Sequence, residues 1–177
     1  MIKKIGLVIL VAVLVLLGAA MLQPDTFRMQ RAITIKAAPE KIIGLIDDFH
    51  AWSTWSPWEH LDPAMQRSYS GPARGKGAVY GWQGDSKVGA GRMEVLESSP
   101  PSKVVIKLDF LKPFESHNMT EFQVETKGDT STVTWVMTGP SAFMTKLMGV
   151  FVSMDSMVGP DFEKGLAQMK QVAEKAP

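Results

Sequence analysis

Three histidines are the side chains of this sequence with the widest choice of chemistry, since imidazole serves as a general base and as a metal ligand. His60 lies in Glu59-His60-Leu61-Asp62, between two carboxylates. The segment has the character of a loop and holds no second histidine, so a solvated loop is favoured over a metal site. The chain contains no cysteine, which excludes thiolate ligands and disulfides. We predict no metal site, no cofactor and no assigned catalytic residue.

A polar row on the predicted strand 114–126 is the second group with chemical potential. Phe122 shares its register and is typical of a core-facing position, so the polar row should face inward and His117 should face solvent. Buried polar groups require partners, so the row either satisfies itself with a water or orients a ligand. The row consists of Ser116, Asn118 and Thr120.

Three of the five tryptophans fall within Phe49–Glu59. Trp52 and Trp55 are three residues apart and should share one face of a helical turn. Pro57 should end that turn and leave Trp58 on the exit loop. We expect Trp52 and Trp58 to pack in the core and Trp55 to face a cavity.

The elements that must position these residues can be read from hydrophobic periodicity. A strand at 27–36 leads into a helix that opens at Ala38-Pro39-Glu40, with proline in the first turn. Strands follow at 65–70, 78–83, 88–97, 103–111, 114–126 and 131–138. After Gly139-Pro140 the pattern is helical to the end, with an interruption expected at Gly159-Pro160.

The C-terminal helix carries a broad apolar stripe that includes Phe143, Leu147 and Phe151. An antiparallel sheet of this length must bury one face, and this helix is the only element large enough to cover it. The fold class is therefore α+β. A curved sheet around a helix leaves an apolar space of the kind in which small ligands bind.

The chain resembles the SRPBCC superfamily. The resemblance rests on Ile33–Ile42 running into Asp48-Phe49, on Trp52–Trp58, and on the Gly71-Pro72 and Gly139-Pro140 pairs. It implies a helix-grip fold, with a curved antiparallel sheet of about six to seven strands around a long C-terminal helix and two short helices after the first strand. Within the superfamily, which includes START domains and birch-pollen-allergen-like proteins, the chain is most similar to bacterial polyketide cyclase/dehydrase-like proteins. The resemblance implies a hydrophobic-ligand cavity and no particular reaction.

The N-terminal segment is a membrane anchor or a signal sequence. Lys3 and Lys4 precede residues 5–22, which contain no polar side chain. Eighteen helical residues span roughly 27 Å, close to the thickness of a bilayer's hydrocarbon core. We therefore divide the chain into a membrane segment (1–24) and a ligand-binding domain (25–177). The two lysines should stay cytoplasmic, which places the domain in the periplasm or outside the cell, and secretion after signal cleavage is the alternative.

The charge balance argues against some partners. The chain has a net charge of +1, and without the two anchor lysines it has 17 basic and 18 acidic residues. This balance, with no basic cluster, excludes a nucleic-acid footprint. The sequence makes no prediction of oligomeric state.

The preferred function is the binding or transport of a small hydrophobic ligand, lipid or polyketide-like. A cyclase/dehydratase-type enzyme, in which Asn118 or His117 assists proton transfer, and a structural or partner-binding module with a filled core are the alternatives. Methionines in the predicted lining either fill gaps or adapt to varied apolar ligands. The candidate ligand-binding residues are Trp55, Tyr80, Trp82, Met93, Phe110, Asn118, Trp135, Met137, Met144 and Met148.

Overall fold

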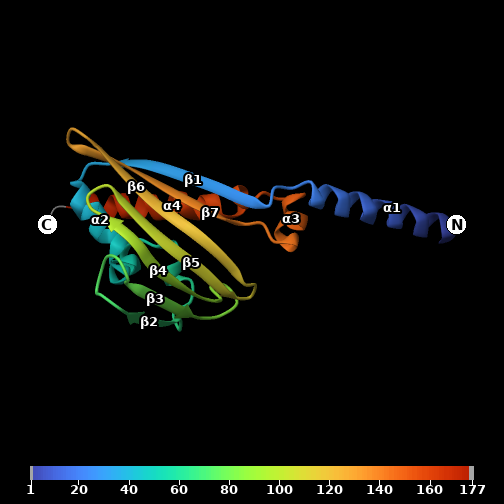
Figure 1. The fold of residues 1–177 in the computed structure, drawn as a ribbon, viewed down its shortest axis with the longest axis horizontal. Coiled ribbons are helices and arrows are strands. Elements are labelled where there is room, and N and C mark those ends of the chain that lie inside the picture. Colours follow the sequence, from blue (N-terminus) through green and yellow to red (C-terminus); the bar gives the residue numbers. More distant parts are fainter. Residues whose placement is uncertain (1, 176–177) are drawn as a thin grey trace.

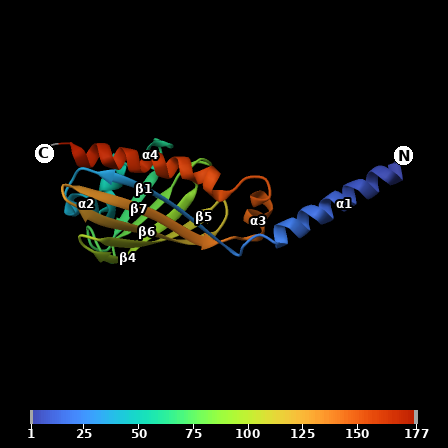
Figure 2. The ribbon, with the colours of Figure 1, turned by 90° about the horizontal axis from the view of Figure 1, so that it is seen from above.

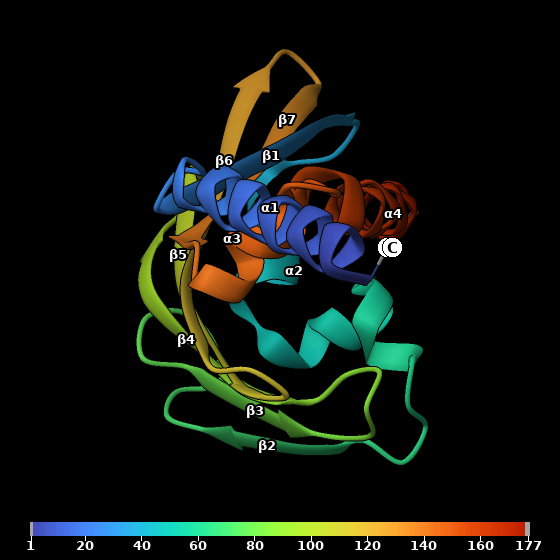
Figure 3. The ribbon, with the colours of Figure 1, turned by 90° about the vertical axis from the view of Figure 1, so that its right-hand side faces the viewer.

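The computed structural model describes residues 2–175, whose centre is one seven-stranded antiparallel sheet. The strand order is β1-β7-β6-β5-β4-β3-β2, so the first strand lies at one edge beside the last (Figure 1). The sheet curves around a concave face (Figure 3). The strands are β1 (Thr26–Ile35), β2 (Gln66–Ser70), β3 (Val79–Gln83), β4 (Ala90–Ser99), β5 (Lys103–Lys112), β6 (Ser116–Lys127) and β7 (Thr130–Pro140).

Alternating side chains give the sheet one buried face, as the period-two pattern predicts. On β7 the residues Val133, Trp135 and Met137 are buried, and Trp135 pairs with the buried Phe122 of β6. The predicted strands are confirmed, with ends that shift by a few residues.

Between β1 and β2 lie α2 (Pro39–Asp47) and two short 3₁₀ helices, η1 (Phe49–Thr54) and η2 (Pro57–His60). Two indoles cap the end of α2. The Nε1 of Trp52 donates to the Ile46 carbonyl at 2.8 Å, and that of Trp55 donates to the Leu45 carbonyl at 2.7 Å. The last carbonyls of a helix have no partner within it, so the tryptophans satisfy them while filling the core.

The C-terminal region forms two helices, α3 (Phe143–Gly149) and α4 (Met154–Glu174). The interruption expected at Gly159-Pro160 lies instead at residues 150–153, where Ser153 accepts a hydrogen bond from the Ser156 amide and begins α4. A proline normally pushes the preceding residue out of the helical region by contact with its Cβ. Gly159 has no Cβ, so α4 continues through Pro160.

The long helix α4 covers the concave face of the sheet (Figure 2) and buries Phe162, Leu166, Met169 and Ala173. The apolar stripe of α3 does not, which corrects the expectation that it would: Phe143, Met144, Met148 and Phe151 are all exposed. The break before Ser153 turns α3 away from the sheet and against the end of the N-terminal helix.

The N-terminal helix α1 (Ile2–Met21) projects from the domain (Figures 1 and 2). Its window Lys4–Met21 has a mean hydropathy of 2.6, and only 6% of that window is buried. By length and composition it can cross a membrane, a test that a signal sequence also passes. The helix is consistent with either.

Candidate ligand cavity

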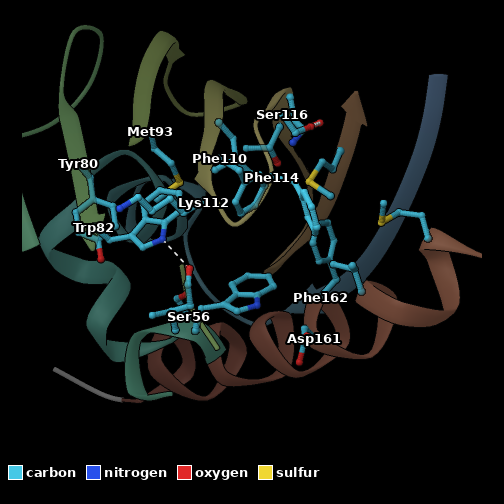
Figure 4. A pocket seen from close by; sticks show the side chains of 18 of the residues that line it. Ser56, Tyr80, Trp82, Met93, Phe110, Lys112, Phe114, Ser116, Asp161 and Phe162 are labelled. Atoms are coloured by element: carbon cyan, nitrogen blue, oxygen red, sulfur yellow. Dashed lines mark hydrogen bonds between the residues drawn. The ribbon is translucent and has the colours of Figure 1, made fainter. Parts of the chain in front are cut away.

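A cavity of about 420 Å³ lies between the concave face of the sheet and the first turns of α4. Figure 4 shows Met93, Phe110 and Ser116 reaching toward it from the strands and Phe162 from the helix. Its walls are mostly apolar, and aromatic rings contact one another around it: Trp135 stacks on Phe162 with ring centroids 3.9 Å apart. The volume falls within the range of small-molecule sites, which is roughly 300–1,000 Å³.

Seven of the ten residues predicted for ligand binding line this cavity, although their contact with a ligand stays a prediction. They are Tyr80, Trp82, Met93, Phe110, Asn118, Trp135 and Met137. All seven come from strands, because the sheet's alternation determines which residues face inward.

The other three lie elsewhere, and their expected positions are corrected. Trp55 is 1% exposed and packs edge-on against Phe122 and Trp135 in the filled part of the core. Met144 and Met148 lie on the outer surface of α3, since that helix is turned away from the sheet.

Trp52 and Trp58 line the cavity instead, although the sequence indicated packing for both. Trp58 lies edge-on to Trp135 and Phe162, which joins η2 to the cavity wall. The triplet spacing of the tryptophans was visible in the sequence, but their separate faces depend on where each 3₁₀ turn ends.

One polar group in the cavity wall is the Glu59 side chain, which is 6% exposed. Its carboxylate accepts from the Tyr80 hydroxyl at 2.6 Å and from the Arg67 Nε at 2.8 Å. Burial raises the pKa of Tyr80, and the hydrogen bond to Glu59 raises it further, so the phenol stays a donor. The bond to Glu59 also raises the pKa of Arg67. Both carboxylate oxygens are thus engaged within the protein.

Sequence reasoning did not select Glu59, because the neighbouring His60 drew attention to metal chemistry. His60 is exposed, and its Nε2 lies 2.9 Å from the Ser53 carbonyl oxygen. Among the described residues, no three metal-ligating side chains lie together.

The second polar group in the cavity wall is the Asn118 side chain, which is 4% exposed. Its Oδ1 accepts from the Ser116 hydroxyl at 3.2 Å. Thr120 is fully engaged, because it donates to the Val136 carbonyl at 3.0 Å and accepts from Trp135 Nε1 at 2.7 Å. Within residues 4–175 no group accepts from the Asn118 amide nitrogen, which leaves that donor available to the cavity.

Gly139 makes room for this amide. A Cβ at Gly139 would lie 1.9 Å from Asn118 Oδ1, so only glycine lets the side chain rest against β7. The predicted inward polar row therefore divides into a satisfied pair and one free donor.

His117 points away from the cavity, as its register predicts. Its Nδ1 lies 2.7 Å from Asp109 Oδ1 on the outer face of the sheet. Burial alone raises the pKa of Asp109, but hydrogen bonds to Lys107 and His117 outweigh it, and the net shift is downward. This pair cannot reach a ligand in the cavity.

A curved antiparallel sheet that wraps a long C-terminal helix, with an apolar cavity between them, defines a helix-grip protein. The family described as "Polyketide cyclase / dehydrase and lipid transport" matches residues 26–174. The chain belongs to this family, which lies in the SRPBCC superfamily and implies the binding of hydrophobic ligands.

Solved structures share the fold at low sequence identity. A protein from Chromobacterium violaceum is 16% identical, with a TM-score of 0.59, over 87% of this chain and 100% of that one. Major latex-like protein 151 from Panax ginseng is 15% identical, with a TM-score of 0.60, over 86% and 100%. The Aha1 dimer from Colwellia psychrerythraea is 20% identical, with a TM-score of 0.55, over 84% and 96%. At these identities the likeness concerns the fold alone. No curated protein matches the chain.

Proposed function

We propose that this protein binds or carries a small hydrophobic molecule, a lipid or polyketide-like compound, in the cavity between the sheet and α4. The observation that carries the proposal is the cavity of about 420 Å³, whose walls are largely aromatic and aliphatic. Each Å² of apolar ligand surface removed from water contributes about 25 cal/mol, so burial supplies most of the affinity.

Asn118 orients the ligand in this proposal. Its amide nitrogen is the free donor beside the apolar walls, so it selects a molecule with a hydrogen-bond acceptor, such as a carbonyl or carboxyl oxygen. Glu59 is held by Tyr80 and Arg67 and serves to fix the cavity wall.

The membrane location is part of the same proposal. The 18-residue apolar window of α1 supports an uncleaved anchor, and the basic N-terminal end supports a domain outside the cytoplasm. Protease accessibility in intact spheroplasts tests this: digestion of the domain is expected, whereas protection would contradict the orientation.

Native mass spectrometry of the full chain ejected from detergent micelles tests ligand binding. We expect an extra mass from a co-purifying apolar molecule. Leu108 of β5 lines the cavity and pairs with Asn118 of the neighbouring strand β6. Leu108→Trp should therefore fill the cavity and remove the extra mass. Because the change fills a void, its cost to stability should stay within roughly 1–3 kcal/mol.

The matched control is Met119→Trp, since Met119 lies on the outer face of the adjacent strand and is exposed. It should retain the ligand mass. If wild-type protein and both variants carry no apolar molecule, and added lipids leave their masses unchanged, the cavity is not a ligand site.

A further inference from the structure

The end of the domain nearest α1 carries an exposed apolar surface, which we name the apolar end surface. Phe114 of the β5–β6 turn is 74% exposed and Phe151, just after α3, is 73% exposed. Soluble surfaces rarely gather large apolar side chains in this way. The apolar end surface comprises Leu111, Phe114, Phe143, Met144, Met148 and Phe151.

Helix α3, which supplies half of this surface, is attached to the segment that follows α1. The Asp25 carboxylate forms an ion pair with the Lys146 ammonium group, and the Asp25 carbonyl accepts from the Ser141 amide at 2.7 Å. The hydrogen bond from Lys146 lowers the pKa of Asp25. Helix α3 also contacts α1 directly (Figure 2).

Chain length fixes how far this surface can lie from a membrane. Only residues 22–25 separate the end of α1 from the start of β1. Four extended residues span at most about 14 Å, roughly twice the depth of one headgroup layer, which is about 5–8 Å. If α1 spans the bilayer, α3 lies in or next to the interface.

The mouth of the cavity opens at the same end. Pro113 and Phe114 of the β5–β6 turn line the cavity and are exposed, and Thr145 of α3 also lines it. A molecule that leaves the cavity between the turn and α3 would therefore emerge at the apolar end surface.

We propose that the apolar end surface docks on the bilayer that α1 spans, so that the cavity exchanges its ligand directly with that bilayer. The inference rests on the proposed function and specifies the source of the ligand as a membrane lipid. The exposed side chains would enter the interface, where their burial is favourable, and the ligand would pass between membrane and cavity without crossing water. A second copy of the chain is the alternative occupant, but α1 and its short linker hold this surface toward the membrane.

The absence of cysteine makes a site-specific test direct. Phe114→Cys and Phe151→Cys would each be labelled with an environment-sensitive fluorophore in the full chain, reconstituted in phosphatidylcholine–phosphatidylglycerol vesicles. The control is Leu96→Cys: Leu96 is also exposed, but it lies toward the end of β4 that pairs with the start of β5, away from the β5–β6 turn. We expect blue-shifted emission and strong quenching by lipid-attached quenchers at positions 114 and 151, and neither at 96.

Equal, weak quenching at all three positions would overturn the docking proposal. Blue-shifted emission that grows with the protein-to-lipid ratio, without lipid quenching, would assign the surface to a second copy and also overturn it. Ligand mass in the native spectra is a separate readout, so docking can fail while the proposed binding function stands.

Discussion

The two halves of the space between the sheet and α4 differ in what fills them. In the half away from α1, helix α2 contacts β5 and β6 and supplies Ile42, Ile43 and Ile46, all fully buried. In the half toward α1, α3 reaches the cavity wall only through Thr145, and within residues 2–175 no helix packs against the strands there as α2 does, so the same sheet alternation leaves a cavity. Strand β6 crosses both, with Phe122 packed in the first and Asn118 facing the second. The cavity thus lies where the packing supplied by α2 ends, on strands that keep the same inward alternation.

The largest expected contrast between the halves is in stability. Trp55→Ala removes a fully buried indole and its cap on α2, so it should cost about 3–5 kcal/mol of unfolding free energy. Phe110→Ala widens a cavity that is already open and should cost about 1–2 kcal/mol or less. Urea unfolding in detergent, followed by circular dichroism, measures both. Equal losses would contradict the division into a filled and a hollow half.

Sequence reasoning recovered the fold because its signals are local and periodic. Strand alternation on β7 placed Val133, Trp135 and Met137 correctly, and the same rule found the strand residues of the cavity. The residues that were placed wrongly are those whose position depends on a turn between elements. The break at 150–153 put Met144 and Met148 on the outside, and the 3₁₀ turns exchanged the places of Trp55 and Trp58. Periodicity within an element carries no information on the direction in which the next element leaves.

The next expected effect on stability concerns the contact between α4 and β1, which lies in the half that contains the cavity. The Arg31 guanidinium group bonds Asp155 at 2.8 Å and Glu163 at 2.7 Å. A Cβ at Gly159 would lie 2.2 Å from Arg31 NH2. Gly159→Ala should therefore displace the Arg31 guanidinium group and weaken its ion pairs, which offsets part or all of the stability that alanine adds to a helix.

Gly149→Ala is its matched control, because a Cβ there has no neighbour within 4 Å and lies at the end of α3. Alanine is the better helix former by up to about 1 kcal/mol, so this variant should be neutral or slightly more stable. The same change in stability in both variants would show that helix propensity, and not Arg31, governs the response.

Removing the Asn118 amide donor should have a smaller effect, which is confined to the affinity for a ligand. Asn118→Ala should weaken binding of a fluorescent fatty acid by about five- to tenfold, since one hydrogen bond contributes about 1 kcal/mol. A probe of similar size without an acceptor, such as a pyrene-labelled hydrocarbon, should bind both proteins equally. Equal weakening of the two probes would assign the loss to cavity shape instead of hydrogen bonding.

The smallest expected difference is the response of the two halves to acid. Arg31 lowers the pKa of Asp155, so this carboxylate contributes stability above its unfolded pKa, near 4, that is lost as the pH falls through the folded value. Hydrogen bonds from Lys36 and Lys170 lower the pKa of Glu174 at the other end of α4 in the same sense.

The two ends should nevertheless differ, because Leu166, Met169 and Ala173 keep the last turns of α4 buried when Glu174 is protonated. The first turns border the cavity and depend more on Arg31. Hydrogen exchange below about pH 4 should therefore speed up in the first turns of α4 before the last. Asp155→Asn should produce that faster exchange already at neutral pH, and it should have no further effect in an Arg31→Gln background. Uniform exchange along α4 at all pH values would show that the hollow half is held as firmly as the filled one.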